Sequence, residues 1–254
     1  AADDLGDVLH IGDAIMYRYD RVRHGISYPS DIPGDITEQW TKAKLRRGYE
    51  FIVGVDWQKH PFIVATFWKL YGDPAAPILW CCGELTVQGA EDDFLDELED
   101  NGFTVRETPR QVQEVTSSNI VFIGDASGCW QSADHKGSPS YQVFKKRGYQ
   151  VLPCQPKVGT SGRAPKNPNL GPSYGLCNWL LERDRIKITP AAKIMNTACK
   201  EAVARPTRYG GAMADEPHCH PIDTMRYVCW WVCPPTRKAA AQRPAGAPLV
   251  YTVA

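Results

Sequence analysis

The chain has 254 residues, of which 43% are hydrophobic and 23% are charged, the balance of an ordinary globular protein. This composition excludes collagen-like, coiled-coil and wholly disordered chains, and no apolar run approaches the roughly 20 residues of a membrane helix. Lysine plus arginine and aspartate plus glutamate both number 29, so net charge alone does not indicate a polyanionic partner.

The nine cysteines are an odd number and are sparse for a disulfide scaffold. Several of them, such as Cys81, Cys82 and Cys229, lie in apolar runs, as small core residues do. Residues 1–4 have neither the basic nor the apolar region of a secretory signal. We therefore expect reduced thiols and a reducing, cytoplasmic-type compartment.

Residues 1–48 are rich in turn formers and show no sustained hydrophobic period. We interpret them as a linker or arm packed on the following domain, which we place at residues 49–235. The Ala/Pro-rich residues 236–254 are expected to form a disordered tail.

Three short apolar runs open the domain, each rich in β-branched or aromatic residues and bounded by turn residues. They predict strands at residues 51–56, 62–68 and 78–87. Because the connections between them are short, the three strands should form an antiparallel meander.

Helices and strands alternate in the rest of the domain. Residues 90–100 have the one-sided apolar stripe of a surface helix, and a helical crossover then leads to a strand at 119–125 that should run parallel to a neighbour. The remaining elements are a strand at 149–153 and helices at 139–147, 173–183, 190–204 and 222–231, the last starting after Pro221. This order resembles the ribonuclease H-like fold, an α/β fold whose mixed sheet of five or more strands is flanked by helices.

The charges are unevenly distributed along the chain. Between His135 and Leu181 there are seven bases and no acid, which favours a surface that faces a polyanion, although a chance fluctuation in a loop-rich region would look the same. A Gly/Pro-rich loop in this region carries our candidates for phosphate contacts, Lys157, Arg163 and Lys166. No base-reading motif is present, so we expect DNA binding that depends mainly on the backbone.

Three aspartates stand out as chemistry-bearing residues. Asp56 and Asp125 each end an apolar strand, where burying a carboxylate is costly without a cation or a donor, although each could instead cap its turn. Asp223 falls in the first turn of the last helix, where it could instead answer the helix dipole. The residues alone leave these alternatives open.

As a set, the three aspartates fit a site for hard cations. Mg²⁺ and Mn²⁺ prefer oxygen ligands and keep several waters, so a few carboxylates suffice. Without cations, three clustered carboxylates would repel one another and their pKa values would rise. We therefore expect Asp56, Asp125 and Asp223 to hold two Mg²⁺ or Mn²⁺ ions about 4 Å apart.

Two further residues are candidates for supporting this site without ligating the metal. His220 precedes Asp223 on the last helix, and Glu84, late in the third strand, could help to position a metal water or could be an exposed strand acid. A zinc site built from His218, Cys219, His220, Cys229 and Cys233 is rejected, because ten helical residues separate Cys219 from Cys229 by about 15 Å.

Three blocks resemble the nuclease domain of tailed-phage terminase large subunits. That family shows a Gly-x-Asp on its first strand, an Asp-x-Ser-Gly-like turn after a later strand, and a closing Asp-His-x-x-Asp-Ala-Leu-Arg-Tyr helix. The matching blocks are residues 52–56 (IVGVD), 123–128 (IGDASG) and 220–227 (HPIDTMRY). Cys219 departs from the family pattern, since it stands where an aspartate often precedes His220. The P-loop of the family's ATPase half is not present.

The resemblance implies a metal-dependent endonuclease that cuts concatemeric double-stranded viral DNA during genome packaging, with Asp56, Asp125 and Asp223 as catalytic metal ligands. It also implies a terminase ATPase domain, a portal and a small terminase subunit as partners, with no membrane involved. Such a protein acts in the host cytoplasm, is not part of the mature virion, and is monomeric as an isolated domain. Two alternatives are a resolvase- or transposase-like nuclease of the same fold and a non-catalytic module that docks DNA or the motor.

Overall fold

The computed structural model describes residues 14–27, 36–37, 51–57, 62–101, 105–107, 113–115, 120–129, 139–154, 167–206 and 212–235. The predicted phosphate contacts Lys157, Arg163 and Lys166 and the predicted tail at 236–254 lie outside these residues.

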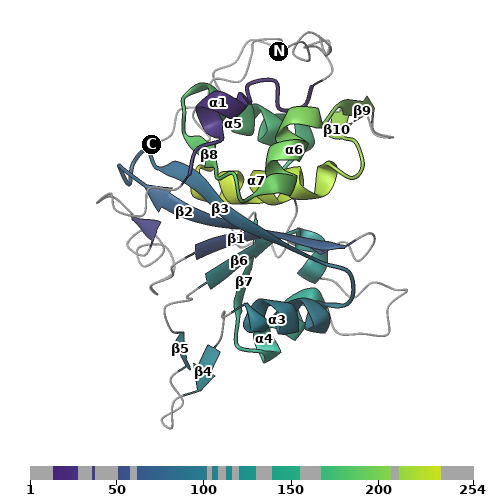
Figure 1. Cartoon of the computed structure of the whole chain (residues 1–254). Helices are drawn as coiled ribbons and strands as arrows, with labels where there is room; N and C mark the ends of the chain where they lie inside the picture. Colours follow the sequence, from purple (N-terminus) through teal and green to yellow (C-terminus); the bar gives the residue numbers. More distant parts are fainter. Residues whose placement is uncertain are drawn as a thin grey trace.

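A mixed six-stranded sheet forms the centre of the fold, in the order β7-β6-β1-β2-β3-β8 (Figure 1). The predicted meander is confirmed, because β1 (Phe51–Asp56), β2 (Ile63–Tyr71) and β3 (Ile78–Val87) pair antiparallel. The predicted crossover is also confirmed, since β6 (Ile120–Gly124) runs parallel to β1. The outer strands β7 (Gln150–Pro153) and β8 (Ile186–Ile188) pair parallel with β6 and β3.

Helices cover both faces of this sheet (Figure 1). The helices α3 (Glu91–Asp100) and α4 (Ser140–Lys146) lie on one face. The other face carries α5 (Leu170–Glu182), α6 (Lys193–Glu201) and α7 (Cys219–Val232).

Successive side chains of β1 point to opposite faces of the sheet, so this strand contributes to the packing on both faces. Ile52 belongs to the apolar cluster beneath α5, α6 and α7, whereas Val53 and Val55 belong to the cluster that contains Phe94 of α3 and Phe144 of α4. All five side chains are fully buried. The sheet therefore has a separate core on each face.

The contact between β1 and α7 sets the position of the last helix. A Cβ atom at Gly54 would lie 2.4 Å from the carbonyl oxygen of Thr224, so only glycine permits this close approach. Beside it, the buried hydroxyls of Thr66 on β2 and Thr224 on α7 lie 2.7 Å apart, and Trp68 Nε1 donates to Thr66 Oγ1 at 2.7 Å. These contacts hold α7 against the middle of the sheet.

Several elements differ from the sequence predictions. The predicted last helix begins two residues earlier than Pro221, at Cys219, because proline fits any position of a first turn, where its missing N–H leaves no bond unmade. The helix predicted to reach residue 204 ends at Glu201, since Ala202 is extended and Val203 forms a bridge with Ala14.

Two short hairpins were not predicted. They pair β4 (Val105–Glu107) with β5 (Gln113–Val115), and β9 (Ala204–Pro206) with β10 (Ala212–Ala214). Strands of three residues are too short to show an alternating pattern.

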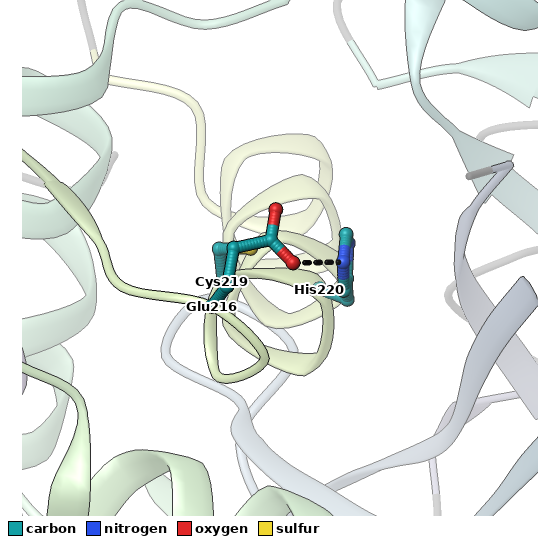
Figure 2. A group of neighbouring side chains, drawn as sticks. All are labelled: Glu216, Cys219 and His220. Atoms are coloured by element: carbon teal, nitrogen blue, oxygen red, sulfur yellow. Dashed lines mark hydrogen bonds and ion pairs between the residues drawn. The ribbon is translucent and has the colours of Figure 1, made fainter. Parts of the chain in front are cut away.

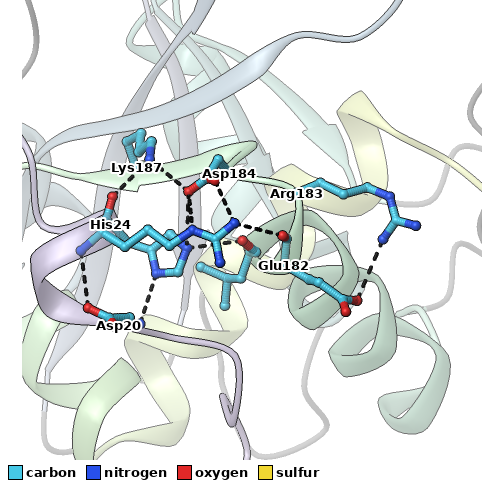
Figure 3. A network of polar contacts seen from close by, with 8 residues as sticks. Asp20, His24, Glu182, Arg183, Asp184 and Lys187 are labelled. Carbon is cyan, nitrogen blue, oxygen red and sulfur yellow. Dashed lines mark hydrogen bonds and ion pairs between the residues drawn. The ribbon is translucent and has the colours of Figure 1, made fainter.

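The described part of the N-terminal region packs on the domain. Met16 is buried, Ile15 N donates to Ala202 O at 3.1 Å, and α1 (Arg21–His24) lies near β8. Figure 3 shows the polar network around Asp184 and Lys187 that fixes this segment. Arg23 Nε donates to Asp184 Oδ1 at 2.6 Å, and Lys187 Nζ donates to Arg23 O at 2.8 Å. The domain boundary at residue 49 stays a prediction.

All nine cysteines lie in the described residues, and none of them forms a disulfide. No helix within the described ranges is both long and apolar enough to cross a bilayer.

Candidate metal centre

A cavity of about 250 Å³ opens where β1 and β6 end beside α7. Asp56 at the end of β1, Asp125 just after β6 and Asp223 on α7 all line it. Its other lining residues are Trp57, Ser127, Met213, Glu216, Cys219 and His220. The structure therefore brings the three predicted aspartates, which are far apart in the sequence, around one cavity.

Strand register places Asp56 next to Asp125. The parallel strands pair Val55 with Gly124, so the next residue of each chain leaves the sheet at the same edge, and Asp125 N donates to Val55 O at 3.4 Å. Ser127 N donates to one carboxylate oxygen of Asp125, which shows that Asp125 does cap its turn. Its other oxygen, Oδ2, accepts from Tyr227 Oη at 3.3 Å.

Asp223 lies in the second turn of α7, not in the first, because the helix starts at Cys219. Its Oδ1 atom lies 3.2 Å from Arg226 Nε but has no hydrogen-bond partner among the described residues. Burial raises the pKa of the Asp223 carboxyl to about 7, with the charges of Asp56 and Asp125 adding to the rise and Arg226 opposing it. Without a bound cation, the cavity therefore disfavours the charged form of the Asp223 side chain.

His220 is nearly inaccessible to solvent and joins two carboxylates. Its Nδ1 lies 2.9 Å from Asp56 Oδ2, and its Nε2 lies 3.2 Å from Glu216 Oε2. Burial lowers the pKa of His220, but the hydrogen bond to Asp56 and contacts with Cys219 outweigh it and raise the pKa to about 10. The sequence predicted His220 as a supporting residue, and the structure places it against Asp56.

Glu84 lies elsewhere. Its carboxylate accepts from Ile194 N at 2.7 Å and from Met195 N at 3.0 Å, so it caps the start of α6 and is not among the residues that line the cavity. The amides at a helix N-terminus attract a carboxylate, which explains this position.

Among the residues that sequence reasoning missed are Arg226 and Tyr227, which contact Asp223 and Asp125, and Glu216, which lines the cavity. Arg226 and Tyr227 follow Asp223 by three and four positions, a spacing that places helical side chains on one face and could have identified them. Glu216 precedes α7, and no local pattern marks it.

The potential ligand atoms do not all converge on one point. Among the described residues, the one group of three whose donor atoms lie within 4.8 Å of one another is Glu216, Cys219 and His220, not the three aspartates. A wider spread of the aspartates is compatible with a pair of ions, which share ligands across about 4 Å.

No protein-family model matches this chain, and no curated protein sequence matches it either. Solved structures do. The large terminase of a thermophilic bacteriophage, in complex with ATP-gamma-S, superposes with a TM-score of 0.55 and 12% identity over 86% of this chain and 45% of that one. The P22 large terminase nuclease domain gives a TM-score of 0.52 and 11% identity over 84% of this chain and 89% of that one.

The chain has the fold of a large terminase nuclease domain. The predicted ribonuclease H-like α/β fold is thereby confirmed, with a sheet of six strands. The chain spans a little under half the length of the thermophilic phage's large terminase. The nuclease of the phage G20c large terminase, solved with bound magnesium, gives a TM-score of 0.45 at 12% identity.

Proposed function

We propose that this chain is a metal-dependent endonuclease that cuts concatemeric double-stranded DNA during phage genome packaging. The observation that carries the proposal is the meeting of Asp56, Asp125 and Asp223 around one cavity on a terminase nuclease fold. Two of these residues end adjacent strands, and the third comes from a helix that packs on them.

The cavity fits a site for hard divalent cations. Its three carboxylates offer oxygen ligands, the donor type that Mg²⁺ and Mn²⁺ prefer. Asp223 is charged only at a cost in the apo protein, and its buried Oδ1 has no hydrogen-bond donor among the described residues. A cation would meet both needs, so Asp56, Asp125 and Asp223 would hold two Mg²⁺ or Mn²⁺ ions. When bound, such a pair supplies an activated water and offsets charge on the leaving oxygen of a phosphodiester.

The chain's own side chains would orient these ligands. His220 bonds one oxygen of Asp56, and Tyr227 together with Ser127 N bonds the oxygens of Asp125. Fixed carboxylates need little reorganisation when a cation or substrate binds, which lowers the cost of reaching the reactive geometry.

Lys157, Arg163 and Lys166 are proposed to contact the DNA backbone. The described residues that flank this predicted loop lie beside the turn that carries Asp125, since Cys154 N donates to Gly124 O at 3.1 Å and Asn167 Oδ1 accepts from Ala126 N at 2.8 Å. Replacing all three bases with alanine should weaken binding to all DNA sequences alike. The slope of log affinity against log salt should fall by about 0.9 for each phosphate that is no longer neutralised.

Plasmid cleavage with Mg²⁺ or Mn²⁺ tests the proposal. Asp56→Asn and Asp223→Asn should each reduce the cleavage rate by roughly 100-fold or more, because each removes a carboxylate ligand of the cations that stabilise charge at the reacting phosphate. Asp100→Asn, the same chemical change on the exposed end of α3, should cut like the wild type. Equal cleavage by all variants would refute the assignment.

Two other results would identify the alternatives. Metal-independent DNA binding without cleavage at any Mn²⁺ concentration would indicate a docking module, and a preference for branched DNA would indicate a resolvase-like nuclease. The proposed partners are double-stranded DNA, a terminase ATPase domain, the portal and the small terminase subunit, and the proposed place of action is the host cytoplasm.

A further inference from the structure

The rim of the cavity carries a second set of potential metal ligands with a different chemistry. The Glu216 carboxylate, the Cys219 thiol and the His220 imidazole offer oxygen, sulfur and nitrogen atoms that all lie within 4.8 Å of one another. Figure 2 shows the Glu216 carboxylate directed toward the His220 ring at the start of α7. None of the three aspartates belongs to this set.

The start of α7 explains why these three side chains converge. Glu216 lies in the turn before the helix, and Cys219 N donates to Asp215 O at 2.9 Å, which joins that turn to the first helical residues. Cys219 and His220 follow Glu216 by only three and four positions, so the turn and the first helical residues bring the three side chains together. The set is therefore built from one short, continuous segment.

The burial of the three residues suits an ion that enters from solvent. Cys219 and His220 are 4% and 1% exposed, whereas the side chain of Glu216 is 58% exposed. A buried thiol and imidazole supply fixed ligands, and an exposed carboxylate leaves the ion a route from solvent. The cavity itself leaves room on the remaining side.

The orientation of the His220 ring also supports a metal ion at Nε2. Histidines that bind metals usually donate their other ring N–H to a carboxylate, which fixes both the ring and the tautomer. Here the Nδ1 atom of His220 lies 2.9 Å from Asp56 Oδ2, so Nε2 is the nitrogen that faces Glu216. In the metal-free protein Nε2 donates its proton towards Glu216, and a bound metal ion would take the place of that proton.

We infer that Glu216, Cys219 and His220 bind a transition-metal ion of the Zn²⁺ type, separate from the hard-cation site of the three aspartates. Thiolate and imidazole favour such ions and disfavour Mg²⁺. Three protein ligands with a fourth position left to water is the pattern of an open zinc site. Binding releases the thiol proton of Cys219, and any proton on His220 Nε2, to solvent.

This site also differs from the zinc set that the sequence excludes. That exclusion concerns Cys229 and Cys233, which lie at the far end of α7, and it stands. Glu216 replaces them as the third ligand. The inference does not depend on nuclease activity, although the bond between His220 and Asp56 links the two sites.

Titration of the full, metal-free and reduced chain with Co²⁺ alone tests the inference. Cobalt bound by a thiolate gives a sulfur-to-metal charge-transfer band, which an aspartate site cannot give. We expect this band in the wild type, its disappearance when Zn²⁺ is added, and its absence in Cys219→Ser. Cys82→Ser, which removes another partly exposed thiol on β3, should keep the band.

Two further variants keep the test decisive if Cys219→Ser folds poorly. Glu216→Gln changes an exposed side chain and should weaken Co²⁺ binding roughly 10-fold or more, at least as much as the loss of a supporting partner does. Asp125→Asn should keep the band at the wild-type affinity, because it alters only the aspartate site.

The inference is overturned by any of three results. The first is a wild-type protein with no charge-transfer band in excess Co²⁺, and the second is a band that persists in folded Cys219→Ser. The third is a band that disappears in Asp125→Asn, which would show that the thiolate-bound ion is not separate from the aspartate site. None of these results bears on cleavage with Mg²⁺, so the proposed nuclease function stands or falls separately.

Discussion

Asp223 and Arg226 lie 3.2 Å apart on α7, yet neither Asp223 Oδ1 nor Arg226 Nε forms a hydrogen bond within the described residues. The two side chains attract each other by charge but are not locked together by geometry. Arg226 also lies over the ring of Tyr174, 4.8 Å from its centroid, whereas Asp223 faces two other carboxylates. The pair is therefore asymmetric, because the arginine has aromatic support, whereas burial and the two carboxylates disfavour the charge of the aspartate.

Removing the arginine should expose this dependence. Arg226→Met leaves a buried carboxylate without its counter-charge, and loss of one partner of a buried pair costs about 3–5 kcal/mol of unfolding free energy. Adding Asp223→Asn should restore part of that loss. Urea unfolding of the wild type, the two single variants and the double variant at pH 8 measures the coupling. Asp223→Asn should change stability by a different amount in the Arg226→Met background than in the wild type, and equal changes in the two backgrounds would contradict the proposed pairing.

The apo protein should become more stable when Asp223 loses its charge. A carboxyl whose pKa is raised to about 7 on folding favours the folded state at low pH, and that contribution is lost as pH rises from about 4 through about 7. At pH 8, and without metal, Asp223→Asn should therefore exceed the wild type by about 1–2 kcal/mol, allowing for the partner that Arg226 loses. At pH 4 the two proteins should unfold alike.

Metal should reverse that order. Mg²⁺ at 100 times its dissociation constant stabilises a binding protein by about 2.7 kcal/mol, so the wild type should gain in melting temperature and Asp223→Asn should gain little. Thermal unfolding with and without Mg²⁺ provides the comparison. A variant that gains as much as the wild type would show that Asp223 is not a ligand.

The close contact at Gly54 should be intolerant of even a methyl group. Gly54→Ala places a carbon 2.4 Å from Thr224 O, and overpacking of this kind costs about 1–3 kcal/mol. Because the strain displaces the helix that carries Asp223, Mg²⁺ affinity should fall as well. Gly83→Ala is the matched control, since a Cβ there meets nothing within 4 Å. Equal stability of the two variants would refute the role of this contact.

The network around Asp184 should make stability depend on pH in the opposite direction to Asp223. Hydrogen bonds from Arg23 and Lys187 lower the pKa of Asp184 to about 2. A lowered carboxyl pKa contributes stability above pH about 4, and this stability is lost as pH falls towards 2. Asparagine tolerates the positive φ of residue 184. Asp184→Asn should therefore lower the free energy of unfolding by less than about 1 kcal/mol, because the side chain is half exposed. The difference from the wild type should vanish near pH 2 in urea unfolding.

The sequence predicted the sheet well because buried strands carry strong, continuous signals. The apolar runs that end at Asp56 and Asp125 mark two adjacent strand ends, and parallel pairing alone makes them neighbours. The helix that carries Asp223 is also predicted by its apolar pattern, although it starts two residues before Pro221. Local patterns therefore located all three aspartates.

The remaining features depend on tertiary contacts that no local pattern encodes. Glu84 has the same sequence character as a metal-supporting acid, but the amides of α6, more than a hundred residues later, hold it. Glu216 precedes a helix without any periodic signal, and the turn that leads into α7 sets it beside His220. Arg226 contradicts the usual exposure of arginine, because its partners are Asp223 and the ring of Tyr174.

Ribosomes make the chain from its amino end, so Asp56 and Asp125 exist long before α7 does. Until that helix emerges and packs against Gly54, the residues of α7 that line one side of the cavity are absent, and the third carboxylate is missing. An unfinished polypeptide thus cannot assemble the centre. If the domain cuts DNA as proposed, the order of synthesis itself protects nearby nucleic acid from incomplete copies of the enzyme.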